Sequence, residues 1–171
     1  MVKIRLGVPP RVCIAASAVV LLAGCSGGAP APTSSLASPG VPLGTTQTLT
    51  NGADELAVTA YSLRQVQPGQ AGSATPRPGN HYTGLDVEVC PNFAYKLGSN
   101  THWALTDSKN SEYQPQRTKI DELAPHYPIS PMQVAANECT RGWVIFETKD
   151  GQPITTVEYF GGSTLQWTVA G

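Results

Sequence analysis

The chain has 171 residues and a formal net charge of −1 at pH 7, and only 13 % of its residues are charged. A length of this order is typical of one domain with a real hydrophobic core. Because few basic residues are available to hold a polyanion, the composition argues against nucleic-acid binding.

The chain begins with the pattern of a secretory signal. Lys3, Arg5 and Arg11 supply positive charge, and residues 12–23 form an apolar run of a dozen residues. At about 1.5 Å per helical residue, this run is too short to cross a hydrocarbon core of ~30 Å. It therefore predicts a removable signal peptide over residues 1–24 rather than a permanent membrane span.

The four residues Leu-Ala-Gly-Cys at positions 22–25 close this apolar run. They resemble the lipobox of bacterial lipoproteins, which implies cleavage before Cys25 and a diacylglyceryl group on its thiol. Two or three acyl chains hold a protein stably on a membrane, whereas one chain binds only marginally. We therefore expect a lipid anchor on the extracytoplasmic face of the cell membrane. The alternative is a simple secreted protein with an incidental cysteine.

A change of composition separates a linker from a folded domain. Residues 25–43 are rich in Pro, Ser and Gly and show no apolar periodicity, which predicts a disordered linker. Short strand patterns follow, and the folded domain is expected over residues 44–171. Cleavage removes three of the eleven basic residues and leaves eight against twelve acidic ones, so the mature chain carries a net charge of −4.

The domain shows strand patterns and no sustained helical period. Residues 85–89 alternate apolar and acidic side chains, as in a strand with one buried face. Residues 143–147 predict a central strand with Val144 and Phe146 in the core. Further strands are predicted at residues 45–49, 56–66, 103–105, 113–120, 154–160 and 165–169, and loops at 67–80 and 121–131. Together they predict an all-β, immunoglobulin-like β-sandwich of about seven or more antiparallel strands.

Two cysteines belong to the folded domain, because Cys13 leaves with the signal peptide and Cys25 is lipidated. In an oxidising exterior a lone pair such as Cys90 and Cys139 usually forms a disulfide. The alternatives are a redox pair or metal ligands, but the chain has no Cys-x-x-Cys motif and no histidine beside either cysteine. We therefore expect a structural disulfide.

Four stretches carry a resemblance to a known family, namely LGTTQTLTNGADELAVTAYSLRQV, YTGLDVEV, RGWVIFET and ITTVEYFGGSTLQWTV. Their order resembles the telokin-like, immunoglobulin-like domains of Gram-positive extracellular lipoproteins and the related mycobacterial secreted immunoprotective antigen family. The similarity covers roughly residues 44–171. It implies an immunoglobulin-like β-sandwich at the cell envelope and no catalytic residues. Cys90 departs from the family pattern, which places the disulfide in a subfamily.

The order Cys90, Trp103, Cys139 also echoes that of true immunoglobulin domains. However, the spacing between Trp103 and Cys139 is short, and the tyrosine expected two residues before the second cysteine is Asn137. Pro91 also places Cys90 at a strand end. We interpret the echo as coincidence and expect a bridge at a loop edge.

Two carboxylates, Asp86 and Glu88, share one face of a predicted strand. Such a pair could serve acid–base chemistry or hold Ca²⁺, but a solvated outer face is the favoured interpretation. No Gly-x-Ser-x-Gly elbow, phosphate loop or His-Glu-x-x-His motif is present.

Metal-ligand patterns are weak. The three histidines lie in separate segments and never at metal-ligand spacing, which favours surface or loop positions; they are His81, His102 and His126. Asp107, Asn110 and Glu112 loosely resemble a calcium loop, but without the EF-hand spacing an ordinary turn is favoured.

Aromatic residues are the better indicators of binding. Tyr127 lies between prolines and Tyr95 lies in a loop after Pro91, so either could anchor a partner. The favoured function is a lipid-anchored extracytoplasmic module that binds a protein or envelope partner, with no catalysis, cofactor or metal. The alternatives are a carrier of a small ligand, lipid or metal, and an envelope hydrolase that uses Asp86 and Glu88.

Overall fold

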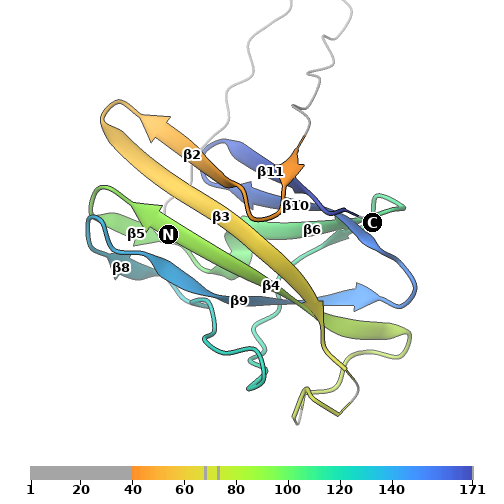
Figure 1. The fold of residues 1–171 in the computed structure, drawn as a ribbon. Coiled ribbons are helices and arrows are strands. Elements are labelled where there is room, and N and C mark those ends of the chain that lie inside the picture. Colours follow the sequence, from red (N-terminus) through yellow and green to blue (C-terminus); the bar gives the residue numbers. More distant parts are fainter. Residues whose placement is uncertain (1–39, 68, 73, 171) are drawn as a thin grey trace, which may run out of the picture. The chain divides into compact units, whose positions relative to one another are not determined.

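The computed structural model describes residues 40–67, 69–72 and 74–170, and these residues form eleven β-strands and one three-residue 3₁₀ turn (Figure 1). The expected signal peptide and Cys25, the expected site of lipidation, lie outside the described residues. The strands are β1 (Val41–Pro42), β2 (Thr46–Asn51), β3 (Asp54–Gln65), β4 (Asn80–Pro91), β5 (Tyr95–Leu97), β6 (Trp103–Asp107), β7 (Glu112–Tyr113), β8 (Met132–Val134), β9 (Thr140–Lys149), β10 (Ile154–Phe160) and β11 (Thr164–Thr168), and the 3₁₀ turn η1 spans Asn100–His102.

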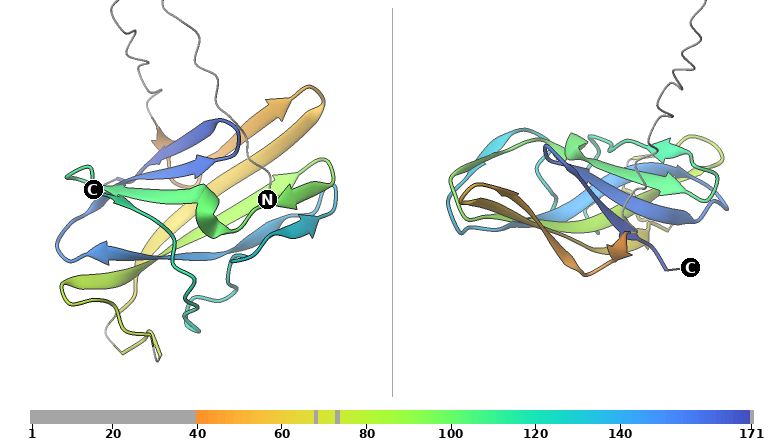
Figure 2. Two further views of the ribbon diagram at one scale, coloured as in Figure 1. Left: turned by 180° about the vertical axis from the view of Figure 1, so that it is seen from behind. Right: turned by 90° about the horizontal axis from the view of Figure 1, so that it is seen from above.

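Two sheets pack as the layers of a β-sandwich (Figure 2). One has the order β1-β11-β10-β6-β7, the other has the order β2-β3-β4-β9, and β5 and β8 form a separate two-stranded sheet. Neighbouring strands are antiparallel except for β1 and β11, which run parallel. The predicted all-β sandwich is therefore confirmed.

The alternating strand predicted at residues 85–89 places its apolar side chains in the core. Leu85, Val87 and Val89 on β4 are buried in the main hydrophobic cluster between the sheets. Val144 and Phe146 on β9 join the same cluster, as predicted from their strand pattern. Successive side chains of a strand point to opposite faces, so the intervening residues occupy the outer face of the four-stranded sheet.

Large aromatic residues fill the space between the sheets. Trp103, Tyr159 and Trp167 are fully buried and come from β6, β10 and β11. The ring centroids of Trp103 and Tyr159 lie 4.8 Å apart, and those of Trp103 and Trp167 lie 5.9 Å apart. Fully burying such a side chain contributes roughly 1.5–3 kcal/mol, so these three rings supply much of the stability of the sandwich.

The segment between β7 and β8 covers the outer edge of β9. The amide of Gln116 donates to the carbonyl of Ile145 over 2.7 Å, and the amide of Tyr127 donates to the carbonyl of Trp143 over 3.1 Å. β9 is thus the last strand of its sheet and not a central strand as predicted, although its edge is paired. Ile120 and Leu123 of this segment pack on the outer face in a second, smaller core, together with Val66, Tyr82 and Ile145.

Three local features differ from the sequence-based expectation. Val41–Pro42, within the stretch expected as linker, pairs with β11, and Gly44 donates a hydrogen bond to Ala60. The strand predicted at residues 113–120 is limited to β7, because the chain then leaves its sheet to reach β9. The short strands β5 and β8 were not predicted, since three residues carry too little periodicity to be recognised.

The structure joins Cys90 and Cys139 in a disulfide with a Cα–Cα distance of 4.2 Å. Val89 pairs with Thr140, so the two cysteines stand opposite each other at the ends of neighbouring strands in one sheet. This arrangement matches the expected bridge at a loop edge and differs from the inter-sheet bridge of immunoglobulin domains.

Within the described part of the chain, no helix has the length and apolar character needed to cross a membrane.

Candidate binding site

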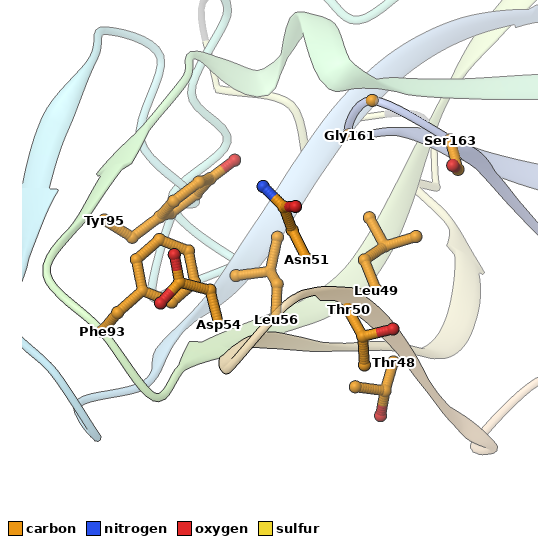
Figure 3. A pocket seen from close by; sticks show the side chains of 11 residues that line it. Thr48, Leu49, Thr50, Asn51, Asp54, Leu56, Phe93, Tyr95, Gly161 and Ser163 are labelled. Carbon is orange, nitrogen blue, oxygen red and sulfur yellow. The ribbon is translucent and has the colours of Figure 1, made fainter.

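A pocket of about 590 Å³ opens at one end of the sandwich (Figure 3). Three turns that are distant in the sequence surround it. The β2–β3 hairpin contributes residues 48–56, the connection from β4 into β5 contributes Phe93 and Tyr95, and the β10–β11 turn contributes residues 161–163. A volume of this size lies within the range of ~300–1,000 Å³ that is usual for small-molecule sites.

The β2–β3 hairpin holds the aromatic wall in place through Asn92. The carboxamide oxygen of Asn92 accepts a hydrogen bond from the amide of Glu55 over 2.7 Å, and its Nδ2 donates to the carbonyl of Ala53 over 3.1 Å. The amide of Asn92 also donates to the carbonyl of Glu55 over 2.9 Å. Phe93, the next residue, is therefore fixed beside the hairpin.

Glycines shape the opposite wall. Gly162 has a φ of 91°, which residues with a side chain rarely adopt. A Cβ at Gly161 would lie 2.5 Å from Cε1 of Tyr159 and 2.9 Å from Cδ1 of Leu49. The predicted Gly161-Gly162 turn is therefore required both by its backbone conformation and by its close approach to the core.

The lining combines aromatic rings with polar side chains that include one acidic group, Asp54. Phe93 and Tyr95 meet edge to face with their ring centroids 5.6 Å apart, at an interplanar angle of 79°. Asn51, Asp54 and Ser163 bring an amide, a carboxylate and a hydroxyl to the same space (Figure 3). None of the described residues that line the pocket is basic.

The hydroxyl of Tyr159 is buried in the core beside the pocket. Tyr159 is fully buried, and among the described residues its hydroxyl has no hydrogen-bond partner; the same holds for Nε1 of Trp103. Burial raises the pKa of Tyr159 above its ordinary value of 10.0, and the neighbouring Tyr95 raises it further. Tyr95, which lines the pocket, is thus also the polar neighbour of this buried hydroxyl.

The two tyrosines proposed from the sequence as anchors for a partner have different environments. Tyr95 is half-buried and lines the pocket. Tyr127 is only 2 % exposed and belongs to the main core, so its proposed role as a surface anchor is corrected. Its amide pairs with β9, which draws the ring inward in spite of the flanking prolines.

Asp86 and Glu88 form an interaction network on the outer sheet face. Nη2 of Arg141 donates to Oδ2 of Asp86 over 2.7 Å, and the hydroxyl of Tyr61 donates to Oε2 of Glu88 over 2.8 Å. The guanidinium of Arg141 also lies 4.2 Å from the ring centroid of Tyr61. Cross-strand pairs of this kind stabilise a sheet, and both carboxylates are occupied by them.

His81 takes part in a chain of hydrogen bonds at the inner face. Its Nδ1 lies 2.8 Å from Oδ1 of Asp150, and its Nε2 lies 3.0 Å from Oγ1 of Thr148. The order hydroxyl, imidazole and carboxylate resembles a nucleophile triad. However, Thr148 is 1 % exposed and its hydroxyl also bonds to Thr83 over 2.8 Å, so this hydroxyl has a structural role.

The other two histidines lie elsewhere. Nε2 of His126 lies 2.9 Å from the carbonyl of Ile120, and the ring of His102 packs edge-on against Tyr159 with centroids 6.0 Å apart. The three histidines are half-buried and are not brought together.

Asp107 organises the turn after β6. Its Oδ1 accepts from the amides of Lys109 and Ser111 over 2.8 and 2.9 Å, and its Oδ2 accepts from the hydroxyl of Tyr113 over 2.6 Å. The Tyr113 hydrogen bond is the largest cause that lowers the pKa of Asp107 to about 2. Asn110 follows with a φ of 61°. The carboxylate oxygens are committed to this turn, in line with the ordinary turn favoured from the sequence.

Glu88, Cys90 and Cys139 also place potential metal-ligating atoms within 4.8 Å of one another. Both sulfur atoms belong to the disulfide, so they do not act as thiolate ligands.

Sequence reasoning missed most of the pocket. Two of its three turns were recognised from Asn51-Gly52 and Gly161-Gly162, and Tyr95 was singled out. Phe93 and Asp54 carried no signal of their own, because only the register of β3 against β4 brings them to the same end of the sheet.

Neither protein-family models nor curated proteins match the chain. Among solved structures, it is similar to a secreted protein from Mycobacterium tuberculosis, MPT63, with a TM-score of 0.58 and 16 % identity over 78 % of this chain and 99 % of that one. The yjhA protein from Bacillus subtilis has a TM-score of 0.48 and 10 % identity over 76 % of this chain and 99 % of its own. A β-sandwich protein from Clostridium difficile 630 has a TM-score of 0.44 and 12 % identity over 77 % and 95 %. The likeness to MPT63 shows a common fold, which confirms the fold implied by the resemblance noted from the sequence.

Proposed function

We propose that the chain is a lipid-anchored binding module of the cell envelope that performs no catalysis. The observation that carries this proposal is the pocket of about 590 Å³ at one end of the sandwich, formed by three turns held on a rigid scaffold. Binding sites are commonly built on loops that a rigid framework positions. The disulfide and the paired edge of β9 supply such a framework.

The anchor rests on the sequence. A lipid on Cys25 would tether the domain to the outer face of the membrane through the linker that precedes β1. Cys25→Ala is expected to release the protein into the medium or to leave an uncleaved precursor. Fractionation and mass determination distinguish these outcomes from unchanged membrane retention, which would contradict the anchor.

The binding role is tested by photocrosslinking in intact cells. A benzophenone amino acid replaces Ser163, an exposed residue of the pocket, and Ser108, an exposed residue of the β6–β7 turn, serves as the matched control. We expect covalent adducts from position 163 and none from position 108. Equal adducts from both positions, or none from either, would contradict a binding role for the pocket.

A further inference from the structure

The polar groups of the pocket narrow the chemistry of its ligand. Asn51 and Ser163 offer a carboxamide and a hydroxyl, and Asp54 is the one acidic residue among the described lining residues. Phosphates, sulfates and carboxylates are usually held by arginine, lysine or a helix N-terminus. The described lining residues include no arginine or lysine, and the elements around the pocket are strands and turns. These groups favour a neutral ligand that is rich in hydroxyl groups.

The aromatic wall supplies the complementary apolar contact. Phe93 and Tyr95 are both half-buried, so part of each ring remains accessible beside the polar groups. Their edge-to-face packing at 5.6 Å fixes both rings in one orientation. A sugar ring presents C–H groups on its faces and hydroxyls around its rim, which matches an aromatic wall flanked by hydrogen-bonding side chains. An acyl chain would instead leave these polar groups unpaired on burial.

We infer that this pocket binds a neutral sugar unit of an envelope glycan, with Phe93 and Tyr95 against its C–H face and Asn51 and Asp54 hydrogen-bonded to its hydroxyls. This inference rests on the proposed function and specifies its ligand class. Asp54 accepts hydrogen bonds from the sugar, whereas Asn51 can donate as well as accept.

The test uses the full chain as cells export it, held in detergent. The probes are neutral oligosaccharides of glucose, galactose, mannose, arabinose and N-acetylglucosamine, together with uronic-acid and phosphorylated counterparts, all at up to millimolar concentration. We expect at least one neutral oligosaccharide to bind and its charged counterpart to bind more weakly. Binding by none of the neutral probes, or binding by charged probes alone, would overturn the inference.

Substitutions in the pocket test whether the sugar binds there. Phe93→Ala and Ser163→Trp, the latter filling the pocket from an exposed turn, are each expected to weaken binding about tenfold or more, as for central contacts of an interface. Phe160→Ala is the matched control, because Phe160 is a 39 % exposed aromatic residue outside the pocket lining. If Ser163→Trp keeps the Tm of the parent protein, misfolding is excluded as the cause of its weaker binding. Retention of full affinity in both pocket variants would place the sugar elsewhere and reject the assignment.

The photocrosslinking experiment separates this inference from the proposed function. If position 163 captures a discrete protein while neutral oligosaccharides do not bind, the sugar assignment is rejected and the binding module remains. If position 163 captures nothing and no oligosaccharide binds, both are rejected.

Discussion

The ring of Tyr127 stands perpendicular to that of Trp103, with the two ring centroids 6.4 Å apart. Tyr127 comes from the segment that covers β9, whereas Trp103 belongs to β6 of the opposite sheet. The contact therefore links the covering segment to the centre of the sandwich. Burial raises the pKa of Tyr127 above its ordinary value, as expected for a hydroxyl removed from water.

Tyr127→Ala is expected to lower the free energy of unfolding by about 3–5 kcal/mol, because it leaves a large cavity in the core. Tyr127→Phe keeps the ring and should cost much less. Urea unfolding of both variants measures the difference, with Phe160→Ala as an exposed aromatic control. Equal stability of Tyr127→Ala and the parent protein would contradict the buried position.

The disulfide between Cys90 and Cys139 is expected to stabilise the folded domain. Cys90 and Cys139 close a loop with a sequence separation of 49. The double variant Cys90→Ser/Cys139→Ser is expected to lose about 4 kcal/mol in the chain-entropy model while retaining its β-structure. Urea unfolding and far-ultraviolet circular dichroism test both parts. Free thiols found at Cys90 and Cys139 themselves in the unfolded, unreduced protein, by alkylation and peptide mass determination, would rule out the bridge itself.

Two buried glycines are expected to differ in their tolerance of alanine. A Cβ at Gly142 would lie 2.5 Å from the backbone nitrogen of Tyr127, whereas at Gly84 it would lie 2.5 Å from a methyl group of Leu123. Side chains can move and the paired backbone cannot, so Gly142→Ala should be the more destabilising change. Overpacking typically costs about 1–3 kcal/mol. Chemical denaturation ranks the two variants, and the reverse order would contradict the tight backbone approach at β9.

Acid stability is expected to depend on Asp107. Its folded-state pKa of about 2 lies below the ordinary 3.8, so the unfolded chain binds the proton more readily. This stabilisation is therefore complete above the ordinary pKa and is lost as the pH falls from 3.8 toward about 2. Tyr113→Phe removes the principal hydrogen bond and keeps the ring, so it should flatten the loss of unfolding free energy in this window.

The measurement for this prediction is urea unfolding at a series of pH values for Tyr113→Phe and the parent protein. Glu147, whose pKa is lowered to about 2 chiefly by its hydrogen bond from Arg77, contributes in the same acid range in both proteins. Its contribution therefore cancels in the comparison. Parallel curves for the two proteins would show that the Tyr113 hydrogen bond does not lower the pKa of Asp107.

The features that were predicted correctly from the sequence are those that depend on local patterns of residues. Alternation at Leu85, Val87 and Val89 gave the strand and its buried face, and the cysteine count gave the disulfide partners. The position of Tyr127 could not be read from its neighbours, because hydrogen bonds to β9 about 16 residues away draw it inward. Sheet order and very short strands such as β8 likewise depend on tertiary contacts.

The candidate site was less predictable than the fold. The turn at Gly161-Gly162 and the aromatic residue Tyr95 were visible individually, but nothing in the sequence placed them beside Asp54. A pocket assembled from three distant turns has no periodic signature. Its recognition requires the register of both sheets.

The binding role of the pocket is best tested by mapping, without prior choice of ligand, where the domain binds envelope material. Backbone amide chemical shifts are recorded by nuclear magnetic resonance while a solubilised envelope extract is titrated into the protein. We predict shifts concentrated at Asn51, Phe93 and Gly161, which belong to the three turns around the pocket. Shifts confined to the outer face around Tyr61 and Arg141, or no shifts at saturating extract, would contradict binding at the pocket.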